Sequence, residues 1–154
     1  MMIAALALAT MLQPTDMKVF GHWTVSCDDG RRCVAMEMKN PHKLNALHDA
    51  SMRITRGARG GMTVEIWPGR KVAAPVTIRI GKTLVYRGRI KGDVLRLTGE
   101  RGVRAARAAA TAAGDGFVIR ADDGSYSGTV PLYGVSHSLR YMDQQQGRDH
   151  ASFA

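Results

Sequence analysis

The chain is poor in cysteine, in aromatic residues and in acids. It has two cysteines, and no second Cys/His pair sits at the spacing of a zinc ligand set. Aromatic residues make up 6% of the chain, which leaves little for a platform on which nucleic-acid bases would stack. With 13 Asp and Glu against 22 Lys and Arg, the net charge of +9 favours anionic partners, whether nucleic acid, phospholipid headgroups or surface polysaccharide.

The motifs of common catalytic sites are also missing. The sequence has no nucleophile elbow, phosphate-cradling glycine loop, HExxH motif or nucleotide fingerprint. Ser136 and His137 are adjacent, but neighbouring residues on a helix point about 100 degrees apart, so they do not form a nucleophile–base pair unaided. Glu37 is the one acid that the strand pattern places partly in the core. The sequence therefore predicts that the protein is not an enzyme.

The N-terminal residues suggest export. Residues 1–12, MMIAALALATML, are apolar and too short to span a bilayer, which is typical of the hydrophobic part of a signal peptide. No Lys or Arg precedes this run, so a misassigned start codon and an ordinary N-terminal helix remain alternatives. We assign residues 1–15 to a signal peptide and residues 16–154 to a single β-rich domain, because a chain of this length can build one core.

Residues 21–38, GHWTVSCDDGRRCVAMEM, carry the strongest local pattern. Two β-prone runs flank an Asp-Gly turn signal, which predicts a hairpin. Because side chains alternate along a strand, Trp23 and Cys27 share one side, and Cys33 can lie opposite Cys27. We predict a Cys27–Cys33 disulfide, which favours an oxidising compartment. The main alternative is a pair of buried free thiols in a cytosolic protein.

Between residues 51 and 100 the pattern changes to period-two alternation with glycine and proline punctuation. It predicts an antiparallel meander with one solvent-exposed face. We expect four arginines at outward positions of neighbouring strands, namely Arg79, Arg87, Arg89 and Arg96. They form either a solvated face that keeps the strand edges unpaired or a flat anion-binding patch.

Two helices are expected. Residues 102–113 are rich in alanine, which predicts a crossover helix lying on the sheet with Val103, Ala106 and Ala110 along its packed face. A second, amphipathic helix is expected between residues 134 and 147, near the C-terminus. With the strands, these helices predict a mainly β (α+β) fold, either an antiparallel β-sandwich or a curled meander.

The remaining polar residues do not indicate a metal site. His42 and His48 are six residues apart, so on a helix they would lie on different faces, and we expect both to be solvated. Residues 122–125, DDGS, lack the further acids of a calcium loop and are typical of a turn. We predict no metal and no cofactor.

Two separated segments resemble those of a known family. Residues 20–33, FGHWTVSCDDGRRC, resemble the opening of exported Gram-negative bacterial proteins known as the domain of unknown function 1176 family. Residues 135–148, VSHSLRYMDQQQGR, resemble its second signature. The matching residues are Trp23, Leu139, Arg140, Asp143, Gln146, Gly147 and Arg148. The layout is also similar to that of the invasion-associated locus B proteins.

That resemblance implies export and a β-rich domain, and it implies no reaction. The signature residues Asp143 and Arg148 are expected to form a C-terminal cap, pairing with each other or with strand ends.

Taken together, the sequence predicts an exported periplasmic or surface-associated protein that acts as a non-catalytic binding module with a basic face. Its expected partner is an anionic envelope component or another protein; peripheral membrane contact is compatible with this, and nucleic acid is not expected. Two alternatives stay open. One is a cytoplasmic nucleic-acid-binding module, which the charge permits and the cysteine pair argues against. The other is a cell-envelope hydrolase. The sequence leaves the oligomeric state open.

Overall fold

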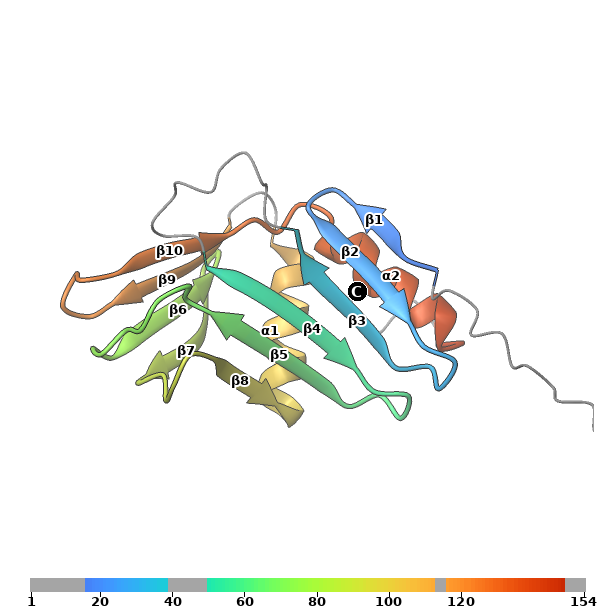
Figure 1. Ribbon diagram of the computed structural model, residues 1–154, viewed down its shortest axis with the longest axis horizontal. Helices are drawn as coiled ribbons and strands as arrows, with labels where there is room; N and C mark the ends of the chain where they lie inside the picture. Colours follow the sequence, from blue (N-terminus) through green and yellow to red (C-terminus); the bar gives the residue numbers. More distant parts are fainter. Residues whose placement is uncertain (1–15, 39–49, 113–115, 149–154) are drawn as a thin grey trace, which may run out of the picture.

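A computed structural model describes residues 16–38, 50–112 and 116–148 of the chain. Within these residues it forms two antiparallel sheets, with both helices behind the larger one (Figure 1). The larger sheet contains, in spatial order, β1 (Lys18–Phe20), β2 (Trp23–Cys27), β3 (Cys33–Glu37), β4 (Ser51–Arg56), β5 (Met62–Trp67) and β8 (Leu95–Thr98). The smaller sheet contains β10 (Ser127–Val130), β9 (Phe117–Ala121), β6 (Val76–Ile80) and β7 (Thr83–Gly88). The helices are α1 (Gly99–Thr111) and α2 (Val135–Gln145).

The chain passes back and forth between the two sheets. After β5 it forms the β6–β7 hairpin of the smaller sheet, returns as β8 beside β5, and then crosses through α1 to β9. The predicted mainly β fold is confirmed, and the sheets do not close into a barrel. The single meander expected between residues 51 and 100 is wrong, because alternation fixes the two faces of a strand but not the sheet that it joins.

Both sheets and both helices share one hydrophobic core. On the inner face of the larger sheet a row of paired, buried residues crosses five strands and consists of Val25, Ala35, Ile54, Val64 and Leu97. The smaller sheet contributes Ile78, Ile119 and Phe117, all fully buried. Each large side chain buried in this way stabilises the fold by about 1.5 to 3 kcal/mol. The outer faces of both sheets carry most of the polar and charged residues, together with a few exposed apolar side chains such as Met36 and Leu84.

Helix α1 lies on the larger sheet, as predicted, but it begins at Gly99, three residues before the expected start at residue 102. Its buried face differs in part from the predicted one: Ala106 is buried as expected, whereas Ala110 is only partly buried. Gly102 and Ala105 are buried, whereas Val103 is only partly buried. The reason is close packing, because a Cβ at position 102 would lie 2.8 Å from the carbonyl oxygen of Leu97. The helix therefore turns its glycine, not its valine, toward the strands.

One strand of the smaller sheet departs from simple alternation. In β7, Leu84 pairs with Arg79 and Tyr86 pairs with Ile78, with a register shift between these pairs. Val85 is buried and Leu84 is 44% exposed, whereas uninterrupted alternation would put Leu84 on the same side as the inward-facing Tyr86. A β-bulge explains the difference, since one extra residue reverses the side-chain direction on either side of it.

Helix α2 carries the predicted apolar positions Val135, Leu139 and Met142, all buried. No helix in the described ranges is both long enough and apolar enough to cross a bilayer. The expected signal peptide at residues 1–15, together with His42 and His48, lies outside the described residues.

Candidate functional site

The four arginines of the predicted anion-binding patch do not share one surface. Arg79 and Arg87 lie on β6 and β7 of the smaller sheet, and Arg89 follows β7. Arg96 lies on β8, which belongs to the larger sheet. The expectation that all four stand on neighbouring strands is therefore wrong, because the chain changes sheets between β7 and β8.

Two of these arginines have contacts that hold them in place. The Arg89 guanidinium donates a hydrogen bond to the carbonyl oxygen of Ala73 at 2.7 Å. Arg96 Nε donates to Glu65 Oε1 at 2.7 Å, and Arg53 Nε donates to Glu65 Oε2 at 2.6 Å. Each of these two side chains thus has at least one guanidinium donor engaged within the protein.

Glu65 is the centre of this cluster on the outer face of the larger sheet. Its side chain is 6% exposed. Burial alone would raise the pKa of the Glu65 carboxyl, but the hydrogen bonds from Arg96 and Arg53 outweigh burial and hold the pKa below its ordinary value. Arg53 also lies over the Trp67 ring, 5.1 Å from its centroid. The acid therefore stays ionised and balances part of the positive charge on this face.

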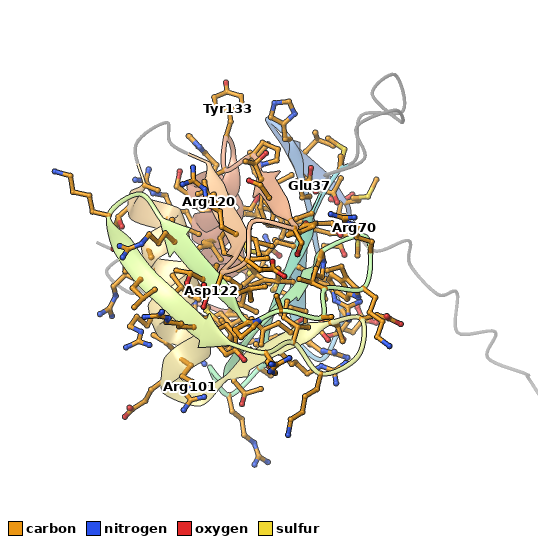
Figure 2. The ribbon with its side chains drawn as sticks, turned by 90° about the vertical axis from the view of Figure 1, so that its left-hand side faces the viewer. Glu37, Arg70, Arg101, Arg120, Asp122 and Tyr133 are labelled. Atoms are coloured by element: carbon orange, nitrogen blue, oxygen red, sulfur yellow. A yellow bond between two sulfur atoms is a disulfide. The ribbon has the colours of Figure 1, made fainter. Side chains whose placement is uncertain are left out.

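The outer face of the smaller sheet brings together Arg79, Arg87 and Arg120, which we call the basic face. Arg120 on β9 and Arg87 on β7 both pair with Thr77 of the intervening strand β6, so they share one cross-strand row. Figure 2 shows Arg120 and Asp122 on the side of the molecule that this sheet forms. The prediction missed Arg120, although its place in the alternating segment Phe117–Ala121 marks it as outward-facing.

Among the residues that the structure describes, one acid, Asp122, forms an ion pair with the basic face. Asp122 Oδ2 is 3.8 Å from the Arg87 guanidinium, and Asp122 Oδ1 accepts a hydrogen bond from Thr77 at 3.0 Å. The Arg87 side chain is 71% exposed. Arg79 makes a long contact of 3.4 Å with the Lys82 carbonyl oxygen. These arginines therefore keep most of their donors directed toward solvent.

The family-signature residues lie elsewhere, where α2 meets the larger sheet. Trp23 is fully buried, and its indole Nε1 donates to the carbonyl oxygen of Pro131 at 3.0 Å. Leu139 is buried in the core, and Arg140 is exposed on the opposite side of α2. Trp23 thus fixes the segment that leads into α2 against the first hairpin.

Asp143, Gln146 and Arg148 attach the end of α2 to the turns of the larger sheet, and we call them the α2 anchor. Asp143 is fully buried and forms an ion pair with Arg56, the last residue of β4, which is 4% exposed. Burial, together with the nearby charge of Arg148, lowers the pKa of the Arg56 guanidinium. A carboxylate beside it is the group that keeps such a buried charge tolerable.

Gln146 and Arg148 bind backbone carbonyl groups of two turns. The Gln146 side-chain amide donates to the Arg31 carbonyl oxygen at 2.7 Å. The Arg148 guanidinium donates to the Ala58 carbonyl oxygen at 3.1 Å. The first of these turns joins β2 to β3, and the second joins β4 to β5. The anchor therefore ties α2 to both hairpins of the sheet.

Gly147 completes the signature as the end of the helix. Its φ of 64° lies in the left-handed region, which glycine enters without the steric cost of a Cβ. The Arg148 amide donates to the Asp143 carbonyl oxygen at 2.8 Å, and the Gly147 amide donates to that of Gln144 at 3.1 Å. This pair of bonds is a Schellman motif. It directs Arg148 away from the helix axis and toward its turn.

The predicted disulfide lies beside this anchor. Cys27 and Cys33 are directly opposite each other in the β2–β3 register, with Cα atoms 4.0 Å apart and their sulfur atoms bonded. The bond closes the turn that contains Arg31, whose carbonyl group receives the hydrogen bond from Gln146. Cys33 also pairs with Arg56 in the sheet. The disulfide and the signature therefore belong to one structural unit.

Among the residues that the structure describes, no three His, Cys, Asp or Glu side chains gather where they could hold a metal ion. The ring of His137 stacks on Phe20 with centroids 6.1 Å apart. At residues 122–125 the Ser125 amide donates to Asp123 Oδ1 at 3.0 Å, which is turn chemistry. The basic face is therefore the candidate binding surface, and the α2 anchor accounts for the signature.

Comparison with known proteins agrees with this fold. The chain is similar to the crystal structure of invasion associated protein B from Bartonella henselae, with a TM-score of 0.59 and 18% sequence identity. The match covers 87% of this chain and 100% of the other. None of the curated proteins compared with the chain matches it. The family model described as "Protein of unknown function (DUF1176)" matches residues 17–154, and the chain therefore belongs to the DUF1176 family.

Proposed function

We propose that the protein is an exported, non-catalytic binding module whose basic face holds an anionic component of the cell envelope. The observation that carries the proposal is the set of three arginines on three adjacent strands, β9, β6 and β7, of which only Arg87 forms an ion pair, with Asp122, in the described part of the chain. A flat array of guanidinium groups can bind phosphate, sulfate or carboxylate groups, because each guanidinium can donate two parallel hydrogen bonds.

The disulfide supports a site of action outside the cytosol. Structural disulfides persist in oxidising compartments and are rare in the cytosol. The similarity to a protein named for its association with invasion is in keeping with a role at the cell surface. Fractionation of cells that express the full chain tests this part of the proposal; recovery of a reduced protein in the cytosol would overturn it.

The composition of the basic face favours an envelope anion over nucleic acid. The outward residues of the smaller sheet are Thr77, Arg79, Leu84, Arg87, Val118, Arg120, Ser127 and Thr129. None of them is aromatic, and Tyr86, the aromatic residue of β7, pairs with Ile78 on the inner side. Single-stranded nucleic acid is usually held on aromatic side chains that stack with its bases. A polysaccharide or headgroup array needs only the charges.

The test uses two variants with the same change in net charge. In one, Arg79, Arg87 and Arg120 are replaced by Glu. In the other, the exposed helix residues Arg101, Arg104 and Arg107 of α1 are replaced by Glu. Retention on a heparin column and co-sedimentation with vesicles containing anionic phospholipid are measured at physiological salt.

We expect the sheet variant to lose retention and the helix variant to keep most of it, since binding depends on where the charges lie. Heparin and vesicles separate a polysaccharide from a headgroup. Equal loss in both variants would show that net charge alone matters, and full retention by the sheet variant would show that the basic face is not used. Either result overturns the proposal.

A further inference from the structure

In the described part of the chain, β1 is an edge strand of the larger sheet, with β2 as its one paired neighbour. β1 lies at the rim of this sheet, while both helices lie behind it (Figure 1). Strand β1 joins β2 through the two-residue turn Gly21-His22, so that Phe20 pairs with Trp23 and Val19 pairs with Thr24. In a hairpin of this length the closing pair exchanges backbone hydrogen bonds, and the pattern alternates along the strand. The backbone groups of Val19 therefore point toward the edge, and the same alternation, continued by one residue before β1, turns those of Met17 to the same side.

The side chains along this edge are apolar on the outer face. Met17 is 63% exposed and Val19 is 55% exposed. The same cross-strand row continues from Val19 through Thr24 to Met36, which is 44% exposed. Met38, at 37%, lies next to this row. These four residues make up most of the exposed large hydrophobic residues in the described part of the chain.

Charges alternate with these apolar residues and have opposite signs. Asp16 and Lys18 flank Met17, and their side chains are 3.6 Å apart. Both are well exposed, at 87% and 49%. A segment that places an acid and a base two residues apart is complementary to an antiparallel copy of itself.

We propose that β1 is the pairing edge of a symmetric homodimer, in which two copies align antiparallel about Met17. With Met17 opposite Met17 of the second copy, each Asp16 faces Lys18 of the other copy, and the outward backbone groups of Met17 are in phase for hydrogen bonding. Centring the pair on Lys18 would instead place two like charges opposite each other. A one-residue shift would put the backbone groups out of phase. The charge pattern thus favours a second copy as the partner and the Met17-centred register over the Lys18-centred one.

The edge strand β7 of the smaller sheet differs from β1 in its suitability for pairing with another strand. It contains the bulge at Val85, a feature that twists an edge and opposes pairing with another strand. β1 has no such irregularity in its pairing with β2. Two copies joined at β1 would build one continuous sheet of twelve strands, with the Met17 and Val19 side chains of both copies in one apolar stripe.

Cysteine cross-linking tests the register directly. The chain has two cysteines, both in the Cys27–Cys33 disulfide, so an introduced cysteine has no native partner. Residues opposite each other in an antiparallel pair lie about 4.5 to 5.5 Å apart at Cα, within the reach of a disulfide. Met17→Cys should form a covalent dimer under mild oxidation. Tyr133→Cys, at a residue that is 75% exposed and projects from the surface in Figure 2, is the control that should stay monomeric.

Exchanging the charges of Asp16 and Lys18 tests whether the partner is a second copy of the chain. In sedimentation velocity, Lys18→Asp should weaken self-association about tenfold, because two attractive contacts become repulsive at the symmetric interface. The double variant Asp16→Lys with Lys18→Asp should restore it. A wild-type protein that stays monomeric at every concentration, equal cross-linking of the Met17→Cys and Tyr133→Cys variants, or a failure of the double variant to restore association would overturn the proposal.

Discussion

The arginine that pairs with the α2 anchor and the arginines of the basic face have different roles. Arg56 at the anchor is 4% exposed and pairs with a fully buried Asp143. Arg87 on the basic face is 71% exposed at its side chain, and the nearest acid, Asp122, is 3.8 Å away. Breaking a buried pair costs several kcal/mol, whereas an exposed pair contributes 1 kcal/mol or less by typical measurements. The position of an arginine relative to the core therefore decides whether it holds the fold or is available to a ligand.

The cluster of Arg53, Glu65 and Arg96 lies between these two cases. Its acid is buried, but the Arg53 and Arg96 side chains are 35% and 61% exposed. Solvent screens part of their attraction to Glu65. Substitutions in the three places should therefore give a graded series of losses in stability.

The largest loss is expected at the anchor. Asp143→Ala leaves Arg56 charged and without its carboxylate partner in the core, which should lower the free energy of unfolding by about 3 to 5 kcal/mol. Urea denaturation followed by circular dichroism measures it. Arg140→Ala, on the exposed side of the same helix, is the matched control and should change the free energy by less than about 0.5 kcal/mol. A loss below about 1 kcal/mol for Asp143→Ala would remove the distinction between anchor and surface.

The next largest loss of stability is expected at the turn between β2 and β3, to which Gln146 of the anchor is hydrogen-bonded. Replacing both Cys27 and Cys33 by Ser removes a closed loop of a few residues, which should cost about 2 kcal/mol. Because the Gln146 amide binds the Arg31 carbonyl group within that loop, the effect of Gln146→Ala should be smaller in the serine background than in the wild type. Equal effects of Gln146→Ala in both backgrounds would show that the disulfide and the anchor act independently.

Glu65→Gln should lower the free energy of unfolding by about 1 kcal/mol at neutral pH, a loss between those of the anchor and the basic face. The pKa of the Glu65 carboxyl is held below its ordinary value of 4.5. A depressed folded-state pKa contributes stability that is present above the unfolded-state pKa and is lost as the pH falls through the folded-state pKa. The gap between wild type and Glu65→Gln should therefore be constant near pH 7 and close in acid. A gap that widens in acid would contradict this assignment.

The smallest loss is expected on the basic face. Replacing Arg79, Arg87 and Arg120 together by Gln should change the free energy of unfolding by less than about 0.5 kcal/mol for each substitution. Thermal denaturation of the triple variant measures this. A loss of several kcal/mol would mean that these arginines serve the fold, and the contrast with the anchor would fail.

Local patterns predicted much of this structure. Alternation and a short separation placed Cys27 opposite Cys33, and helical periodicity identified the buried side of α2. These predictions depend on residues close together in sequence. Asp143 and Arg148 were expected to pair with each other or with strand ends. Asp143 does pair with Arg56 at the end of β4, whereas Arg148 contacts the carbonyl group of Ala58 in a turn.

The features that the sequence did not predict depend on contacts between segments that are far apart in the chain. Arg96 was placed with Arg87 because their strands are neighbours in sequence, but β8 pairs with β5 in the other sheet. Arg120 was missed because its strand joins β6 only after the chain has crossed through α1. The partner of Asp143 could not be predicted either, since Arg56 at the end of β4 reaches it only when α2 packs against the neighbouring strands β2 and β3. No local pattern carries that information.

The structural role of the signature is tested most directly by a double-mutant cycle between Arg56 and Asp143. The free energies of unfolding of Arg56→Met, Asp143→Leu and the double variant are compared with that of the wild type. Each single variant leaves one buried charge unpaired, so the double variant should be more stable than either, with a coupling free energy above about 2 kcal/mol. Additive losses, with a coupling below about 0.5 kcal/mol, would contradict the assignment of these residues to a structural anchor.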